Sequence, residues 1–133
     1  MKLSVYYVDA FTDKLFSGNP AAVIFSDIKD TNLMQNIASE NNLSETAFIR
    51  EIDGQYHIRW FAPSCEIDLC GHATLASAYV YFNFINPGST ELEVHSAKNG
   101  TLKVVLKNDL LFLDFPKDSI APIHEKLVEK IIG

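Results

Sequence analysis

A long apolar segment runs from residue 67 to residue 85 and carries one acidic or basic residue, Asp68. Residues 72–84 contain no Lys, Arg, Asp or Glu, which predicts a helix that is buried on all sides. Small side chains recur in it at helical spacing: Ala73, Ala76, Ser77 and Val80. A face of small residues lets another element approach closely, so we expect a curled sheet to cover this helix.

Apolar and polar residues alternate near the N-terminus, in Tyr56–Ala62 and in Glu91–His95, and seven segments in all are predicted to be β-strands. These segments are Lys2–Phe11, Ala21–Ser26, Thr46–Ile52, Tyr56–Ala62, Glu91–His95, Thr101–Lys107 and Leu110–Phe115. Three turn-forming pairs lie between them and are typical of β-hairpins: Asp53-Gly54, Asn99-Gly100 and Asn108-Asp109.

Two further segments have helical patterns. Asp30-Thr31 supplies an N-cap for a helix that reaches Asn41 or Asn42, and residues 122–132 form a short amphipathic pattern. We therefore predict an α+β fold with about seven mostly antiparallel strands, one outer helix and one buried central helix. Two known folds match this plan, the hotdog fold and the half-barrel of the diaminopimelate epimerase superfamily. The pattern of elements does not choose between them.

The composition fits one ordinary globular domain. The chain has 133 residues, of which 47% are hydrophobic and 21% charged, with a formal net charge of −6. This negative charge argues against partners such as nucleic acid or an anionic membrane. Apolar runs fall short of the ~20 residues that span a bilayer. The two cysteines, Cys65 and Cys70, lie too close to frame a fold, so we expect a reducing, cytoplasmic location.

The start of the buried helix is a candidate anion site. Its first backbone N–H groups have no partner within the helix, and Gly71 has no side chain to keep a carboxylate away. Cys70 and His72 flank this glycine, and Asp68 is expected to order the preceding turn. A helix N-terminus can lower the pKa of a thiol. The alternative is a tight turn beside an inert, buried cysteine.

Glu45 is the most suggestive carboxylate. It follows Ser44 at a helix-to-strand junction and has apolar neighbours in the sequence. Partial desolvation there would raise its pKa toward the ~6–7 that suits general acid–base catalysis. The alternative is a solvated junction residue without a chemical role.

Other chemistries lack their motifs. The four histidines are scattered, with no HxH or HExxH spacing, so we expect no metal site: His57, His72, His95 and His124. Gly18 stands alone, so neither a P-loop nor a dinucleotide fingerprint is present, and no cofactor is expected. Ser44 lacks the G-x-S-x-G context of a serine hydrolase.

Five motifs occur in order along the chain. They are Phe11-Thr12-Asp13, Gly18-Asn19-Pro20-Ala21-Ala22-Val23, Asn42-Leu43-Ser44-Glu45-Thr46-Ala47-Phe48, Arg59-Trp60-Phe61-Ala62-Pro63 and Asp68-Leu69-Cys70-Gly71-His72-Ala73-Thr74-Leu75-Ala76. Together they resemble the N-terminal half of the PhzF-like isomerases of phenazine biosynthesis, within the diaminopimelate epimerase superfamily. The resemblance covers about residues 3–116.

The resemblance implies roles for particular residues. Glu45 would be the acid/base that shuttles a proton on a small carboxylate substrate, without a cofactor. Gly71 and His72 would bind that substrate, and our leading hypothesis adds Ser44 to the groups that hold its carboxylate. Three residues are secondary candidates: Cys70, which resembles a catalytic thiol of the amino-acid epimerases, Asp68 and Asn19.

Such isomerases carry two similar domains with the active site between them, and nothing after Phe115 resembles the second. We expect residues 1–116 to form the N-terminal domain and residues 117–133 a tail, a short helix or the start of another domain. The leading hypothesis is an isomerase module that pairs as a homodimer or with a missing second domain. The alternatives are a hotdog-like acyl-thioester enzyme and a non-catalytic dimerising module.

Overall fold

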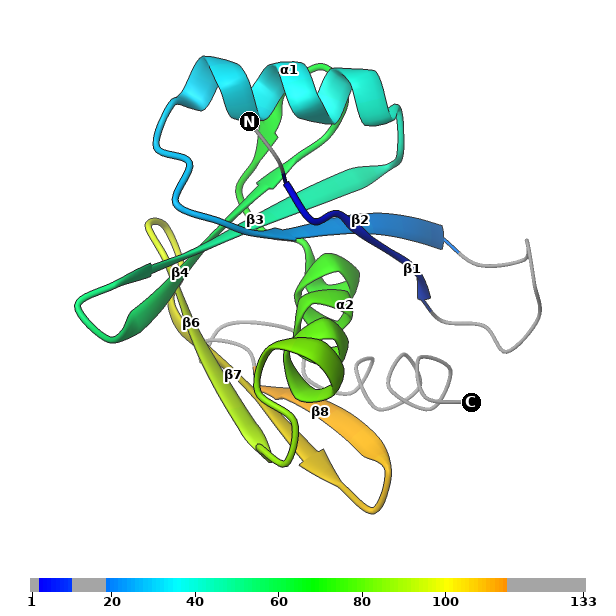
Figure 1. Cartoon of the computed structure of the whole chain (residues 1–133), viewed down its shortest axis with the longest axis vertical. Helices are drawn as coiled ribbons and strands as arrows, with labels where there is room; N and C mark the ends of the chain where they lie inside the picture. Colours follow the sequence, from blue (N-terminus) through cyan, green and yellow to red (C-terminus); the bar gives the residue numbers. More distant parts are fainter. Residues whose placement is uncertain (1–2, 11–18, 115–133) are drawn as a thin grey trace.

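A curled sheet wraps around a central helix in the computed structural model, which describes residues 3–10 and 19–114 (Figure 1). The strands are β1 (Tyr6–Ala10), β2 (Asn19–Phe25), β3 (Glu45–Ile52), β4 (Gln55–Phe61), β5 (Glu66–Ile67), β6 (Glu91–Ser96), β7 (Gly100–Lys107) and β8 (Leu110–Asp114). The helices are α1 (Thr31–Asn41), α2 (Gly71–Val80) and a π-helical turn, η1 (Tyr81–Ile85).

The sheet is mixed but mostly antiparallel. Its strand order is β1-β2-β3-β4-β6-β7-β8, and β5 pairs with β4 beside this path. The pairs β2–β3 and β4–β6 are parallel, because a helix-containing crossover separates the strands of each pair. The predicted α+β half-barrel is therefore confirmed. The sequence pattern missed β5, which has only two residues and so no detectable alternation.

α2 is the core of the half-barrel. It contacts β1, β2, β3 and β8, and its predicted small face is buried: Ala73, Ala76, Ser77 and Val80 are 0% exposed. The Ser77 hydroxyl donates a hydrogen bond to the Ala73 carbonyl at 2.7 Å, so its burial leaves no unpaired polar group.

The prediction of burial on all sides as far as Phe84 is wrong for the last turn. The α-helix ends at Val80, and in η1 the side chain of Phe84 is 58% exposed. Phe84 stacks on Tyr6 of β1 with ring centroids 5.2 Å apart. Apolar composition predicts a preference for burial, but it does not show where the sheet stops covering the helix.

α1 packs on the opposite face of the sheet (Figure 1). Asp30 caps it by accepting hydrogen bonds from the backbone N–H groups of Asn32 at 2.9 Å and Leu33 at 3.4 Å. At the other end Asn42 adopts a left-handed conformation with φ 52°, so the chain turns away from the helix axis. The predicted helix bounds are confirmed, and this turn leads the chain into the start of β3.

The three hairpins occur where the turn pairs predict them. Asn108 and Asp109 both have positive φ, 53° and 63°, which is typical of the two-residue turn that suits twisted strands. Lys2, Phe11 and Phe115, and the predicted helix over residues 122–132, lie outside the described residues. Within the described ranges, every helix is too short or too polar to cross a bilayer.

Candidate active site

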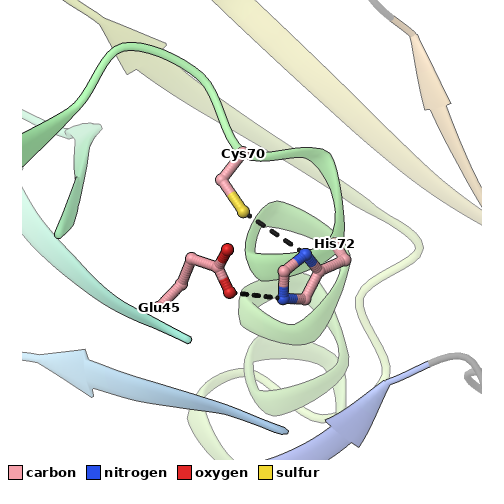
Figure 2. A group of neighbouring side chains, drawn as sticks. All are labelled: Glu45, Cys70 and His72. Atoms are coloured by element: carbon pink, nitrogen blue, oxygen red, sulfur yellow. Dashed lines mark hydrogen bonds and ion pairs between the residues drawn. The ribbon is translucent and has the colours of Figure 1, made fainter. Parts of the chain in front are cut away.

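Side chains from two elements meet at the N-terminal end of α2 (Figure 2). Glu45 is the first residue of β3, Cys70 is the N-cap residue of α2, and His72 lies in its first turn. Nε2 of His72 lies 2.8 Å from Oε2 of Glu45. Nδ1 of the same ring lies 3.4 Å from the Cys70 sulfur. The imidazole therefore contacts both a carboxylate and a thiol.

Strand alternation brings Glu45 to this position. Ala47 and Ile49 of β3 belong to the core around α2, whereas Phe48 belongs to the core beneath α1. Because side chains alternate along a strand, Glu45 shares the face of Ala47 and Ile49. Its side chain is 16% exposed. The predicted acid/base therefore faces the central helix rather than bulk solvent.

A buried hydrogen bond fixes the first turn of α2. Trp60 Nε1 on β4 donates to the Thr74 hydroxyl at 3.0 Å, and that hydroxyl donates to the Cys70 carbonyl at 2.7 Å. Both hydrogen-bonding functions of Thr74 are thus used, and the turn that carries Cys70 is held against β4.

The loop before α2 is also tied to the β6–β7 turn. The Asn99 side chain donates to the Asp68 carbonyl at 2.6 Å, and Lys98 Nζ lies 2.9 Å from the Asp68 carboxylate. Asp68 is exposed and lies outside the Glu45–Cys70–His72 group. These contacts support its predicted role in ordering the turn.

The electrostatics of Cys70 correct one expectation. The pKa of its thiol is raised to about 12, mainly by burial and in part by the neighbouring Glu45 carboxylate. Backbone N–H groups of Ala73 and His72 act in the opposite direction but do not compensate. The expected lowering of this pKa by the helix N-terminus is therefore wrong, because desolvation of the thiolate outweighs it.

Burial also acts on His72, whose side chain is 10% exposed. It lowers the pKa of the imidazole below its usual value of 6.5, and the Glu45 charge partly opposes this effect. A neutral imidazole is therefore favoured at neutral pH, and it can donate one proton and accept another.

The remaining predicted site residues lie around this group. Ser44 is exposed and immediately precedes β3, and Gly71 is the first residue of α2. Asn19 is the first residue of β2, but its side chain is outside the described part of the structure. The roles predicted for these residues stay predictions.

Sequence reasoning missed one feature of the site. Nothing in the sequence signals that His72 contacts Glu45, because the two belong to elements that meet only in the folded sheet. The sequence also predicted no metal site, from the absence of paired-ligand spacing, and this stays a prediction. Glu45, Cys70 and His72 nevertheless place a carboxylate oxygen, a sulfur and a ring nitrogen within 4.8 Å of one another. Their donor types are those of zinc ligands.

The fold and this group of side chains define an epimerase-like half-barrel with titratable groups at the start of its central helix. A predicted epimerase of known structure from Pseudomonas aeruginosa has the same fold, with a TM-score of 0.69 and 24% identity over 84% of this chain and 42% of that chain. The half-barrel, rather than the hotdog fold, is thus the correct alternative.

The family model described as "Phenazine biosynthesis-like protein" matches residues 8–116, and this chain belongs to that family. A PhzF-family crystal structure from Enterococcus faecalis superimposes with a TM-score of 0.81 and 46% identity, covering 94% of this chain and 50% of that one. The resemblance inferred from the five motifs is therefore confirmed.

Sequence relatives agree. An uncharacterized isomerase from Pseudomonas aeruginosa is 49% identical over 87% of this chain and 45% of its own length. A human phenazine biosynthesis-like domain-containing protein is 40% identical over 100% of this chain and 50% of its own length. The chain thus spans about half the length of these relatives.

Proposed function

We propose that this chain is one half of a cofactor-independent isomerase or epimerase that transfers a proton on a small carboxylate metabolite. Glu45 is the acid/base in this proposal. The observation that carries it is the position of the Glu45 carboxylate, which faces the first turn of α2 and lies 2.8 Å from His72 Nε2. The carboxylate can accept a proton, and the adjacent helix N-terminus can bind an anion. The two functions are therefore placed side by side.

The division of labour follows from the local charges. The N-terminal end of α2 carries partial positive charge, so the amides of Gly71 and His72 would bind the substrate carboxylate, with help from the Ser44 hydroxyl. His72 would hold the Glu45 side chain in place. Cys70 keeps its proton near neutral pH because its pKa is raised, which leaves Glu45 as the base.

A partner would complete the site. The relatives are about twice as long as the segment they share with this chain. Large apolar side chains are exposed on the described surface: Tyr7 at 65%, Phe84 at 58% and Ile85 at 37%. We propose that a second domain or a second copy of this chain covers a face that includes these residues. A cytoplasmic location would suit Cys65 and Cys70, both of which are free thiols.

Solvent hydrogen exchange tests the reaction. Small amino acids and unsaturated cyclic carboxylic acids would be incubated with the chain in D₂O containing EDTA, and loss of substrate C–H signal followed by proton NMR. We expect exchange with at least one of them, reduced by about 10²–10⁴-fold in Glu45→Gln. Glu51→Gln, which changes an exposed glutamate of the same strand, is the matched control.

Three outcomes separate the hypotheses. Exchange that persists in Glu45→Gln would remove this residue from the reaction. A loss of exchange that accompanies unfolding, measured by circular dichroism, would mark Glu45 as structural. If the chain binds these acids but exchanges no hydrogen at any protein concentration tested, the non-catalytic module would be favoured.

A further inference from the structure

Glu45, Cys70 and His72 bring together three different donor atoms that a divalent cation can share. The carboxylate oxygen, the sulfur and the ring nitrogen all lie within 4.8 Å of one another. From this geometry we propose that the three residues bind a zinc-class divalent cation. The proposal concerns binding alone and does not depend on the isomerase function.

The sulfur–nitrogen separation suits a metal ion between the two atoms. In tetrahedral zinc sites with Zn–S near 2.3 Å and Zn–N near 2.1 Å, the two ligand atoms lie about 3.6 Å apart. Cys70 Sγ and His72 Nδ1 are 3.4 Å apart. Only a small displacement is needed to admit an ion between them. The printed contact of Glu45 is with Nε2, the other nitrogen of the ring, and an oxygen of its carboxylate lies within 4.8 Å of the sulfur and of a ring nitrogen, so Glu45 becomes the third ligand after its side chain turns toward the ion (Figure 2).

Charge also favours a divalent ion. Binding breaks the S–H bond of Cys70, forms a sulfur–metal bond and releases one proton to solvent. His72 and Glu45 bind through lone pairs and release nothing when the imidazole is neutral and the carboxylate ionised. One thiolate and one carboxylate then balance the two positive charges of the ion. A neutral complex suits a site where the three side chains are mostly buried.

The donor set predicts selectivity. Thiolate and imidazole ligands favour zinc, cobalt and cadmium ions, whereas magnesium and calcium ions prefer oxygen ligands. Three protein ligands leave a fourth position open, as in zinc sites that exchange a water or a small molecule. If Glu45 is also the acid/base, an ion bound here would inhibit proton transfer. That consequence alone rests on the proposed function.

Cobalt(II) is the probe for the test, because a cobalt–thiolate bond gives a near-ultraviolet charge-transfer band. The full chain, with its thiols reduced, would be titrated with cobalt(II) in the absence of any substrate. We expect a saturable band at one ion per chain, displaced by one equivalent of zinc and unaffected by magnesium. Zinc binding in weak buffer should release one proton per chain.

The two cysteines provide a matched pair of variants. Cys70→Ser should abolish the band, whereas Cys65→Ser, which changes the exposed thiol, should leave it intact. Glu45→Gln should weaken cobalt binding by more than about 10-fold. Loss of a residue that only supports a metal ligand already costs about that much, so loss of a ligand should cost more. Circular dichroism spectra that match the wild-type chain would show that the variants are folded.

Some results would overturn the proposal. They are an absence of saturable binding, a band that survives in Cys70→Ser, and a band that is lost in Cys65→Ser. Since the exchange experiment on the proposed function contains EDTA and this one contains no substrate, either proposal can fail without the other.

Discussion

Nε2 of His72 lies 2.8 Å from Oε2 of Glu45, so the first turn of α2 and the first residue of β3 share one electrostatic environment. Burial lowers the pKa of His72, and the negative charge of Glu45 raises it in part. Removing that charge should therefore lower this pKa further.

NMR titration of the imidazole protons in EDTA measures this effect. Wild-type His72 should titrate below its ordinary value of 6.5, and His72 in Glu45→Gln lower still. Glu51→Gln should leave it unchanged. An upward shift in Glu45→Gln would contradict the contact.

The same pKa predicts a pH dependence of stability. A histidine whose pKa is lowered by folding binds fewer protons in the folded than in the unfolded state, so stability rises with pH. The contribution is complete above the unfolded pKa of about 6.5 and is lost as the pH falls from there through the lower folded pKa. Urea unfolding between about pH 7.5 and about pH 5.5 should therefore show a shallower dependence in His72→Gln than in the wild type. Equal slopes would show that His72 titrates alike in both states.

The two cysteines should differ in reactivity. Cys65 is exposed, whereas Cys70 is 8% exposed with its pKa raised to about 12. With a disulfide reagent at about pH 8, one thiol should react quickly and the second only after urea unfolds the chain. Cys65→Ser should remove the fast phase. A fast phase that remains in Cys65→Ser would show an activated Cys70 thiolate.

The Trp60–Thr74 hydrogen bond should contribute to stability. Thr74→Val leaves the buried Trp60 N–H without its acceptor, which should cost about 1–3 kcal/mol of unfolding free energy. Thr31→Val is the control, because the Thr31 hydroxyl accepts an exposed hydrogen bond from Arg59 and its loss should stay within about 0.5 kcal/mol. Equal losses in urea unfolding would contradict the importance of this contact.

Anion binding can be located by NMR. Sulfate or a small carboxylate should shift the amide signals of Gly71 and His72. The amides of Asn32 and Leu33 are an internal control, because the Asp30 carboxylate already caps that helix. Gly71→Val should block binding by placing a branched side chain over the amides. Shifts that spare residues 71 and 72 would place the anion site elsewhere.

Assembly is the last prediction. We expect a homodimer at micromolar concentration, because a second copy can cover the exposed aromatic groups of Tyr7 and Phe84. Phe84→Glu should weaken the dimer, because it places a charge on the apolar face that the second copy would cover. Sedimentation decides the matter, since a single species near the 14.9 kDa mass of one chain would exclude the dimer.

The sequence determined the features that short segments encode. Asp30 and Asn42 set the ends of α1 because capping involves only neighbouring backbone groups. The turn pairs set the hairpins for the same reason, and the uncharged run of residues 72–84 predicted a buried helix. The five motifs were sufficient to identify the family.

Only the tertiary structure decided what depends on distant neighbours. It showed that β3 brings Glu45 to His72, that Phe84 lies beyond the cover of the sheet, and that Cys70 has a raised rather than a lowered pKa. Each of these results depends on the surroundings of a side chain, which are its neighbours, its solvent exposure and the nearby charges. Elements far apart in the sequence supply that environment, so a local pattern does not contain it.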